Sequence, residues 1–293
     1  MVEPHRTGEV ALLGLPNSGK STLMNRLVGE KLAIVTPKPQ TTRGRLVGIL
    51  SLPGAQILLV DTPGLHGGKG ALHEAMQRAA AMAAESCDLA LVLVDLGVGW
   101  EPAHDALVAK LSARGTPWIA VGTKADLPPE RRAPWPPEQS RKAVSCHAVS
   151  ARTGEGLPAL LSDVIARLPE GPAFHPEDEL TDRPVRFLAA ELVREAAFLL
   201  LRQEVPYGLA VEVMQFDESR PELVRIRANL LVARASQKQI VIGAGGAMIR
   251  EIGSRARVEI ERLLGTRVHL ELWVKEEPSW TERRKRIEGL GYG

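Results

Sequence analysis

Eight residues near the start of the chain have the types and spacing needed to bind phosphate. Residues 14–21 form GLPNSGKS and fit the pattern G-x-x-x-x-G-K-S, whose glycines let backbone amides converge on phosphate oxygens. Lys20 places a cation near the β- and γ-phosphates of a nucleotide, and Ser21 offers a hydroxyl to Mg²⁺. A glycine-rich turn is the plain alternative. The run follows an apolar segment and opens a helical one, and this context favours a phosphate site.

Two later segments could sense a γ-phosphate. In D-T-P-G, residues 61–64, Asp61 can hold Mg²⁺ through water and Gly64 can turn its amide toward the phosphate. Residues 36–43, TPKPQTTR, form a polar, proline-bearing loop of the kind that becomes ordered when a γ-phosphate is present. An exposed linker is the plain alternative for this loop.

Two further motifs predict a pocket for a base. In T-K-A-D, residues 123–126, Asp126 can accept hydrogen bonds from guanine while Lys124 packs along the ring. Adenine would face that carboxylate with an acceptor, so the motif favours GTP over ATP. Ser150 and Ala151 follow later in the chain and could complete the pocket through backbone contacts.

These motifs require a scaffold that brings them to one edge. Over residues 1–168, short apolar runs alternate with runs of helical periodicity, which predicts a doubly wound, mostly parallel α/β sheet. We expect strands at 9–13, 46–50, 56–60, 89–94, 118–122 and 144–149, and helices at 20–28, 72–85, 103–113 and 155–168. Because each motif follows a strand, all of them are expected at the carboxyl edge of the sheet.

Together the motifs resemble the translation-factor-like class of small P-loop GTPases. The resemblance implies that one of Thr41 and Thr42 caps Mg²⁺ in the GTP state, and we slightly favour Thr42. It implies a catalytic set of Lys20, Thr42, Asp61 and Gly64, and a metal site formed by Ser21, Thr42 and Asp61. The implied nucleotide-binding residues are Asn17, Ser18, Gly19, Lys20, Ser21, Thr22, Thr41, Asp61, Thr62, Gly64, Thr123, Lys124, Asp126, Ser150 and Ala151.

The chain departs from the usual pattern of this class at Thr123 and after D-T-P-G, and Asn17 adds a further likeness to it. Thr123 stands where the class usually has asparagine, and its shorter hydroxyl predicts weaker nucleotide affinity with guanine preference intact. After D-T-P-G the chain continues Leu65-His66 instead of presenting a water-orienting glutamine, and we interpret His66 as an exposed loop residue rather than a base. Asn17 resembles the asparagine by which some GTPases of this class hold potassium at the arginine-finger position. K⁺ is therefore a candidate cofactor beside Mg²⁺.

A second domain is expected after a linker. Residues 169–184, PEGPAFHPEDELTDRP, are rich in proline and acidic residues, which predicts irregular structure. Residues 185–293 predict a small α+β module, with a helix at 185–201, strands at 207–216 and 223–233, a helix–glycine–helix stretch at 237–264 and a strand at 267–275.

The helix–glycine–helix stretch contains a candidate RNA-binding loop. Residues 241–249, VIGAGGAMI, together with the order of elements resemble a type II KH domain, whose G-x-x-G loop clamps the RNA backbone. A glycine-capped turn between two helices is the plain alternative. The candidate RNA-binding residues are Gly243, Ala244, Gly245, Gly246, Lys238 and Arg250.

Charge is distributed unevenly along the chain. The 37 Lys and Arg nearly balance the 35 Asp and Glu, and the net charge of +2 alone gives no reason to expect a nucleic-acid partner. Residues 225–267, however, hold nine basic residues (225, 227, 234, 238, 250, 255, 257, 262, 267) against three acidic ones (251, 259, 261). Aromatic residues are not interleaved there, so phosphate and base hydrogen bonds would carry RNA affinity. Residues 283–286, RRKR, could extend this surface or form a polar helix face.

Composition narrows the class of protein further. A length of 293 residues fits two domains. Cys87 and Cys146 are too few for a disulfide framework or a four-cysteine zinc site. The polar start MVEPHRTGEV does not resemble a secretory signal, and no apolar run has the length of a membrane span. We therefore expect a cytoplasmic protein without a transmembrane segment.

The whole arrangement closely resembles the Era family of bacterial GTPases. The resemblance includes PEDELTDRPVRF at the junction and HLELWVK near the end. It implies GTP and GDP binding, binding near the 3′ end of small-subunit ribosomal RNA, and a role in assembling the 30S subunit. We expect a monomer and leave open a peripheral association with the inner face of the cell membrane. Two alternatives stay open: a nucleotide-gated RNA-binding assembly factor with negligible hydrolysis, and a GTPase whose C-terminal module binds protein or a membrane.

Overall fold

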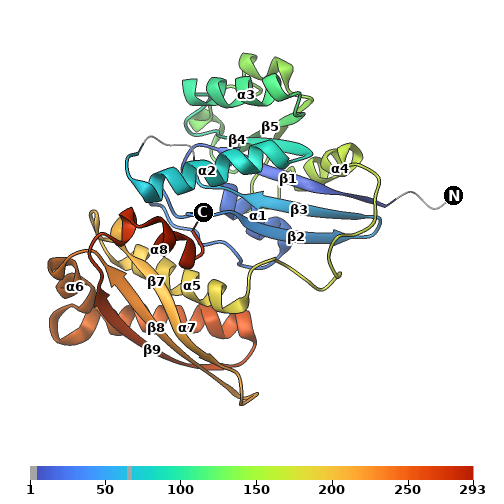
Figure 1. The fold of residues 1–293 in the computed structure, drawn as a ribbon. Helices are drawn as coiled ribbons and strands as arrows, with labels where there is room; N and C mark the ends of the chain where they lie inside the picture. Colours follow the sequence, from blue (N-terminus) through green and yellow to red (C-terminus); the bar gives the residue numbers. More distant parts are fainter. Residues whose placement is uncertain (1–4, 65–67, 293) are drawn as a thin grey trace. The chain divides into compact units, whose positions relative to one another are not determined.

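The computed structural model describes residues 5–64 and 68–292 (Figure 1). These residues divide into two compact units. The first comprises the described parts of Met1–Ala33, Thr42–Gly68 and Met76–Asp182, and the second comprises those of Ile34–Thr41, Lys69–Ala75 and Arg183–Gly293. Two short segments from the first half of the sequence, 34–41 and 69–75, thus cluster with the second unit. Across the described residues, the structure contains no helix that is long and apolar enough to cross a membrane.

The first unit contains a six-stranded sheet in the order β2-β3-β1-β4-β5-β6. Only β2 and β3 pair in antiparallel fashion; every other neighbouring pair is parallel. The strands are β1 (Arg6–Gly14), β2 (Leu46–Leu52), β3 (Ala55–Asp61), β4 (Leu89–Asp95), β5 (Trp118–Thr123) and β6 (Ser145–Ala148). The helices are α1 (Lys20–Val28), α2 (Ala71–Ser86, whose first turn clusters with the second unit), α3 (Pro102–Arg114) and α4 (Leu157–Arg167). The predicted doubly wound, mostly parallel architecture is confirmed.

Burial on both faces of this sheet explains why its strands are apolar. The order of the strands indicates where a ligand crevice forms. β3 and β5 are buried at every position, as expected for near-continuous apolar strands covered on both faces. β1 lies between β3 and β4, and the chain leaves β1 toward β2 on one side, whereas the chain from β3 crosses to β4 on the other side. A ligand crevice forms at the carboxyl end of a strand in that position.

The structure refines several of the predicted boundaries. The helix predicted at 155–168 begins only at Leu157, since Gly156 before it has a φ of 74°. The stretch predicted as helix–glycine–helix at 237–264 forms α6 (Ala235–Ile242), a short 3₁₀ turn (Ala244–Gly246) and α7 (Ala247–Leu264). The strand predicted from 207 begins later, because Val205–Gly208 forms a 3₁₀ turn.

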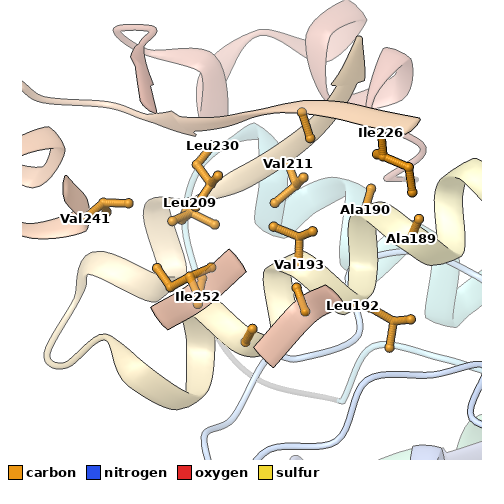
Figure 2. Packing of buried hydrophobic residues seen from close by; sticks show 14 of the residues in the cluster. Ala189, Ala190, Leu192, Val193, Leu209, Val211, Ile226, Leu230, Val241 and Ile252 are labelled. Atoms are coloured by element: carbon orange, nitrogen blue, oxygen red, sulfur yellow. The ribbon is translucent and has the colours of Figure 1, made fainter. Parts of the chain in front are cut away.

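The second unit contains a three-stranded sheet in the order β7-β8-β9. β7 (Ala210–Asp217) and β8 (Leu223–Val232) are antiparallel, and β8 and β9 (Arg267–Glu276) are parallel. α5 (Val185–Leu200) and α7 pack against each other and against the sheet. Figure 2 shows the resulting core, in which Val193 of α5 lies near Val211 of β7 and Ile252 of α7. The element order helix, strand, strand, helix, helix, strand is the one predicted for a type II KH domain.

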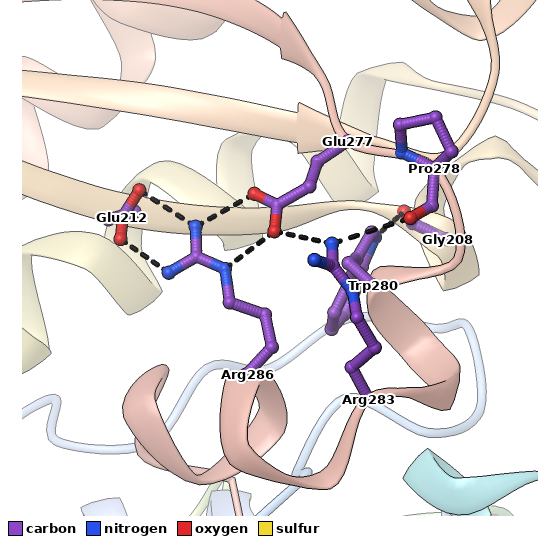
Figure 3. A network of polar contacts seen from close by, with 7 residues as sticks. All are labelled: Gly208, Glu212, Glu277, Pro278, Trp280, Arg283 and Arg286. Carbon is purple, nitrogen blue, oxygen red and sulfur yellow. Dashed lines mark hydrogen bonds and ion pairs between the residues drawn. The ribbon is translucent and has the colours of Figure 1, made fainter.

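A C-terminal segment beyond β9 closes one end of this core. Trp280 is fully buried and its indole Nε1 donates to the Gly208 carbonyl at 3.0 Å. Arg286 of α8 (Arg284–Gly289) lies between Glu212 of β7 and Glu277, donating at 2.6–2.9 Å to both carboxylates (Figure 3). Within the basic cluster 283–286, Arg286 therefore joins α8 to β7 and to the segment that follows β9.

Candidate functional site

The phosphate-binding pattern occupies the turn from β1 into α1. Gly14 has a φ of 154° and a Cβ on it would lie 2.6 Å from the Leu93 carbonyl oxygen, so only glycine fits. Asn17 is exposed with a φ of 63°, a conformation that asparagine tolerates better than most residues. Gly19 is the left-handed N-cap of α1, which places the amides of the first helical turn at the site.

Lys20 lies over this loop. Its Nζ donates to the carbonyls of Gly14 (3.1 Å) and Leu15 (2.9 Å), and the residue is 6% exposed. Burial lowers the pKa of Lys20 to about 8, while the nearby charge of Asp61 opposes that shift. The ammonium of Lys20 is therefore a buried cation that is hydrogen-bonded to backbone carbonyls of the phosphate-binding pattern. Beside it, Ser18 is buried and Thr22 is half-buried.

The three predicted metal-site residues contact one another, with two hydroxyl groups directed at the Asp61 carboxylate. Ser21 Oγ donates to Asp61 Oδ2 at 2.7 Å, and Thr42 Oγ1 donates to the same oxygen at 3.0 Å. The two hydroxyl oxygens are 3.0 Å apart. Asp61 is fully buried, and burial raises its pKa against the opposing effects of Lys20 and the two hydroxyls. Its Oδ1 has no hydrogen-bond partner among the described residues, so the cluster fits a hard divalent cation that prefers oxygen ligands.

Thr41 does not join this cluster through its hydroxyl in any contact that the structure defines. Its carbonyl oxygen instead accepts a hydrogen bond from Arg194 Nη2 of α5, and Thr41 clusters with the second unit. Of the two candidate threonines, Thr42 is the one whose side chain meets Ser21 and Asp61. The predicted residue His66 lies outside the described residues, as does Leu65.

The charged side chains of T-K-A-D are paired with residues from other parts of the chain. Ser150 Oγ donates to Asp126 Oδ1 at 2.7 Å, and Arg152 lies 2.9 Å from Asp126 Oδ2. The hydrogen bond from Ser150 is the largest cause of a lowered pKa at Asp126. Lys124 has a φ of 61° and its ammonium pairs with Asp95 at the end of β4. Ala151 is half-buried beside them.

Thr123 connects this pocket to the phosphate loop. Its Oγ1 is shared between the carbonyls of Ser18 (2.8 Å) and Val94 (3.2 Å). The shorter hydroxyl thus still contacts the loop. Thr62, a predicted nucleotide-binding residue, is buried, and its Oγ1 donates to the Leu12 carbonyl at 2.8 Å. Any nucleotide contact of Thr62 would come from its backbone.

Gly64 approaches the phosphate loop so closely that a side chain would not fit. A Cβ at this position would lie 2.8 Å from the Pro16 nitrogen. Gly64 is therefore packed against the turn from β1 into α1, and the prediction that its amide turns toward a γ-phosphate stays a prediction.

Sequence reasoning missed three features of the base pocket. The predicted backbone contact of Ser150 with a base stays a prediction, and the structure adds a hydrogen bond from its hydroxyl to Asp126. Asp95 and Arg152 pair with the two charged residues of T-K-A-D and were not anticipated. A signal for Asp95 was present, since it is the polar residue that ends the apolar run LALVLVD of β4. Arg152 carries no comparable signal, because its partner is fixed only by the fold.

The G-x-x-G loop joins α6 to α7. Gly243 has a φ of 73°, and a Cβ there would lie 2.7 Å from the Cβ of Met248. Gly245 and Gly246 also have positive φ, and Gly246 is the N-cap of α7. Ala244, Gly245 and Arg250 are exposed, and Lys238 is half-buried. The loop therefore offers bare backbone at the start of an 18-residue helix, an arrangement suited to phosphate.

The cationic segment 225–267 is partly neutralised by ion pairs. Arg255, Arg257 and Arg262 pair with glutamates one turn away on α7, and Arg227 pairs with Glu271 of β9. Within the described part of the chain, no such ion pair engages Arg234, Lys238 or Arg250. Of these three, Arg250 lies beside the G-x-x-G loop, since its Nη1 would be 3.1 Å from a Cβ on Gly246.

Comparison with known proteins finds two family models that match this chain. Residues 9–124 match the family described as 50S ribosome-binding GTPase, and residues 204–281 match the KH domain. The chain is 43% identical to GTPase Era of Xanthomonas axonopodis pv. citri over 297 residues, which cover 100% of this chain and 99% of the relative. The chain belongs to the Era family of GTPases.

Solved structures of Era proteins share this architecture. A crystal structure of Era in complex with MgGDPNP and nucleotides 1506–1542 of 16S ribosomal RNA matches with a TM-score of 0.91 and 36% identity, covering 99% of both chains. A single-residue variant of Aquifex aeolicus Era bound to GDP·AlF₄⁻ matches with a TM-score of 0.93 and 38% identity, over 98% of this chain and 99% of that one. The present Era-family chain is thus a GTPase with a C-terminal KH domain.

Proposed function

We propose that this Era-family GTPase is a GTP-driven switch that binds small-subunit ribosomal RNA near its 3′ end and assists assembly of the 30S subunit. The observation that carries the proposal is the presence, in one chain, of a hydroxyl–carboxylate cluster beside a phosphate loop and a bare G-x-x-G backbone at a helix start. The related Era that holds both MgGDPNP and 16S ribosomal RNA supports it.

The nucleotide would bind along the carboxyl edge of the first sheet. Residues 17–22 would hold the phosphates, with Lys20 at the β- and γ-phosphates, and Asp126, Lys124, Thr123, Ser150 and Ala151 would hold guanine. Ser21, Thr42 and Asp61 fit Mg²⁺, because their oxygens already converge and Asp61 Oδ1 is an unused buried acceptor. When bound, Mg²⁺ neutralises charge that develops on the β- and γ-oxygens.

Within this proposal, Lys20, Thr42, Asp61 and Gly64 act during hydrolysis. Lys20 stabilises the phosphate oxygens, Asp61 and Thr42 keep their oxygens directed at one point, and the Gly64 amide orients the γ-phosphate end. Hydrolysis then needs further stabilisation of negative charge, since D-T-P-G is followed by Leu65-His66 rather than by glutamine. Asn17, exposed at the loop tip, is the proposed holder of K⁺ for this purpose.

The potassium proposal is tested by changing ion and residue together. Wild-type protein is assayed for GTP turnover in KCl and in NaCl of equal ionic strength, and Asn17→Asp is assayed in both. We expect faster wild-type turnover in KCl and a loss of that difference in the variant. Equal wild-type rates in the two salts would contradict the role of K⁺.

Thr123 is proposed to lower nucleotide affinity without changing base preference. Since its hydroxyl still contacts Ser18 and Val94, the missing part is the amide that asparagine would supply. Thr123→Asn should bind GDP more tightly than wild type, measured by competition against a fluorescent GDP analogue. ATP displacing that analogue as well as GTP does would contradict the guanine preference.

RNA would bind at residues 243–246 with help from Lys238 and Arg250. The glycines admit phosphate to the backbone, and the two cations lie on the helices that flank the loop. Crosslinking of the GTP-loaded protein to total RNA, followed by sequencing, tests this directly. Enrichment of the small-subunit ribosomal RNA 3′ end is the expected result. Crosslinks spread evenly over other RNAs would contradict it.

The remaining expectations are part of the same proposal. We propose a GTPase domain at 1–168, a linker at 169–184 and an RNA-binding domain at 185–293. We place the protein in the cytoplasm, where its proposed ribosomal partner is assembled, and we expect a monomer. Peripheral association with the cell membrane stays a prediction, tested by whether the protein sediments with vesicles of anionic lipid.

Turnover measured with and without 30S subunits separates an active GTPase from a slow, nucleotide-gated binder.

A further inference from the structure

The turn that follows β6 carries an exposed arginine that lies against the base motif. The side chain of Arg152 is 76% exposed, and its Nη2 lies 2.9 Å from Asp126 Oδ2. The other oxygen of this carboxylate, Oδ1, accepts from Ser150, which is fully buried. Ser150 therefore contacts the carboxylate from the protein interior and Arg152 contacts it from the solvent side. All three residues belong to the first compact unit.

Hydrogen bonds hold the backbone of this turn. The Ser150 carbonyl accepts from the Gly154 amide at 2.8 Å, and Ser150 Oγ accepts from the Thr153 amide at 3.1 Å. The backbone around Arg152 is thus tied to one buried residue, so we expect Arg152 to leave Asp126 by turning its side chain alone. Exposed side chains change rotamer within nanoseconds, and this movement is therefore fast compared with nucleotide binding.

The guanidinium of Arg152 and the edge of guanine offer similar donors. A guanidinium carries N–H groups on nitrogens bonded to one carbon, in a planar fork that matches a carboxylate. Guanine carries its N1–H and its exocyclic amine on two nitrogens that are likewise bonded to one carbon. With Arg152 in place, only 18% of the Asp126 side chain is exposed. A base must therefore displace the guanidinium before it can bring both donors to the carboxylate.

The competition for Asp126 is electrostatic, because its carboxylate is charged at neutral pH. The hydrogen bond from Ser150 is the largest cause of the lowered pKa of Asp126, and the positive charge of Arg152 also lowers it. Ion pairs with so exposed a partner are weak. The pair can therefore close the base site for much of the time without excluding the nucleotide.

We propose that Arg152 is a competing side chain of the base pocket: its guanidinium occupies Asp126 until guanine displaces it, which lowers the affinity for guanine nucleotides and slows their association. The inference rests on the proposed role of Asp126 in binding guanine. Once displaced, Arg152 extends into solvent and makes no contact with the nucleotide. Dissociation of the nucleotide is therefore independent of Arg152.

The test measures the kinetics with which a fluorescent GDP analogue binds the full-length, nucleotide-free protein in excess Mg²⁺. Arg152→Gln removes the charged fork at an exposed position, so the fold is retained. We expect association to be roughly twofold to sixfold faster and Kd to fall by the same factor, the effect of freeing a site closed by an exposed ion pair. The dissociation rate should not change. Loss of a cation near an anionic ligand would by itself slow association, so the expected direction is opposite to that of a simple charge effect.

A matched control and two further readouts sharpen the test. Arg167→Gln is the control, because Arg167 belongs to the same unit and pairs with Asp163 at 2.9 Å, away from the base motif. It should leave both rates within about 1.5-fold of wild type, the scale of an exposed pair that faces no ligand. Arg152→Lys keeps the charge without the fork and should associate at an intermediate rate. Raising NaCl from about 0.05 to 0.5 M should reduce the difference between Arg152→Gln and wild type, because salt screens exposed ion pairs.

The outcomes separate this inference from the function on which it rests. Slower association, faster dissociation or an unchanged Kd in Arg152→Gln would overturn the inference, and so would an equal gain in Arg167→Gln. Asp126→Ala tests the base site itself and should weaken GDP binding by at least about 100-fold, the effect of losing two charge-assisted hydrogen bonds. If Asp126→Ala kept the wild-type affinity, the proposed guanine site would be wrong, whatever Arg152→Gln does.

Discussion

At the scale of single residues, hydroxyl groups arrange the charged ones. Ser21 and Thr42 both donate to Asp61, Ser150 donates to Asp126, and Thr123 joins two strand ends to the phosphate loop. A hydroxyl can serve this purpose because it turns its hydrogen toward whichever acceptor is near. The carboxylates are thereby directed before any ligand binds.

Replacing Ser150 should impair guanine binding in a pH-dependent way. The Ser150 hydrogen bond lowers the pKa of Asp126, so the carboxylate of the wild type stays charged below its usual range. Its contribution is present above the unfolded pKa and is lost as pH falls through the lowered folded value. In Ser150→Ala that loss should begin at a higher pH. At pH 7 we expect about 10-fold weaker GDP binding, the effect of one charge-assisted hydrogen bond.

The measurement for Ser150→Ala is GDP affinity between about pH 4 and 7, the range over which carboxylates titrate. Ser145→Ala is the matched control, since Ser145 of β6 likewise donates to an aspartate, Asp163, away from the base motif. An acid limb at the same pH in wild type and Ser150→Ala would contradict the prediction.

At the scale of elements, two glycines of the G-x-x-G loop differ in whether a side chain would fit. A Cβ at Gly243 would collide with Met248, whereas a Cβ at Gly245 would meet nothing within 4 Å. Gly243 therefore shapes the turn between α6 and α7. Gly245 is exposed just before the start of α7, and a side chain there would find open space.

Gly245→Asp should weaken RNA binding without unfolding the domain. Aspartate tolerates a positive φ better than most residues, and its charge would repel phosphate at the loop. We expect at least about 10-fold weaker binding to a small-subunit 3′-end RNA, by analogy with the loss of one or two phosphate contacts. Gly265→Asp is the control, because Gly265 also has positive φ and open space but lies at the other end of α7. Equal effects of the two variants on a filter-binding assay would refute the role of the loop.

Arg286→Met should destabilise the second unit through its C-terminal segment. The change leaves Glu212 without its bidentate partner, while Glu277 keeps its ion pair with Arg283 (Figure 3). The hydrogen bond to Glu212 is the main cause of the raised pKa of Arg286. We expect a loss of about 2 kcal/mol, below the cost of breaking a fully buried pair. Urea unfolding measures it. Arg284→Met, which removes an exposed pair with Glu74, should cost under about 1 kcal/mol, and a reversed ranking would contradict the assignment.

At the scale of the whole molecule, most of the proposed nucleotide-site residues and the proposed RNA-binding loop belong to different compact units of one chain. A ligand shifts an equilibrium only when it binds the two states unequally. RNA affinity should therefore differ between protein loaded with a GTP analogue and protein loaded with GDP. A coupling of about 1–3 kcal/mol is typical of such switches, which corresponds to roughly 5-fold to 150-fold.

Thr42→Ala should abolish that difference, because its hydroxyl belongs to the cluster that would sense the γ-phosphate. The measurement is binding of the 3′-end RNA to each nucleotide state of wild type and variant. Equal RNA affinities in the two states of the wild type would show that the sites are not coupled.

Pattern and composition determined a large part of this protein. The phosphate loop, D-T-P-G, T-K-A-D and G-x-x-G depend on glycines and side chains only a few residues apart, and local backbone geometry gives such spacing its meaning. The alternation of apolar runs likewise predicted the parallel sheet of the first unit and the element order of the second, because each buried face requires its own period. Boundaries were less accurate where a glycine such as Gly156 delayed a helix.

Only the tertiary structure decided which distant groups meet. Nothing near Arg194 in the sequence indicates that its partner is the carbonyl of Thr41, 153 residues earlier, and the helical pattern of α5 alone gives no reason to bury three charged side chains. The contact of the Thr42 hydroxyl with Asp61, the Ser150–Asp126 bond and the Arg286 pairs depend in the same way on packing. Sequence determines which groups can form hydrogen bonds, but burial decides which must find a partner, since a buried polar group without one is costly.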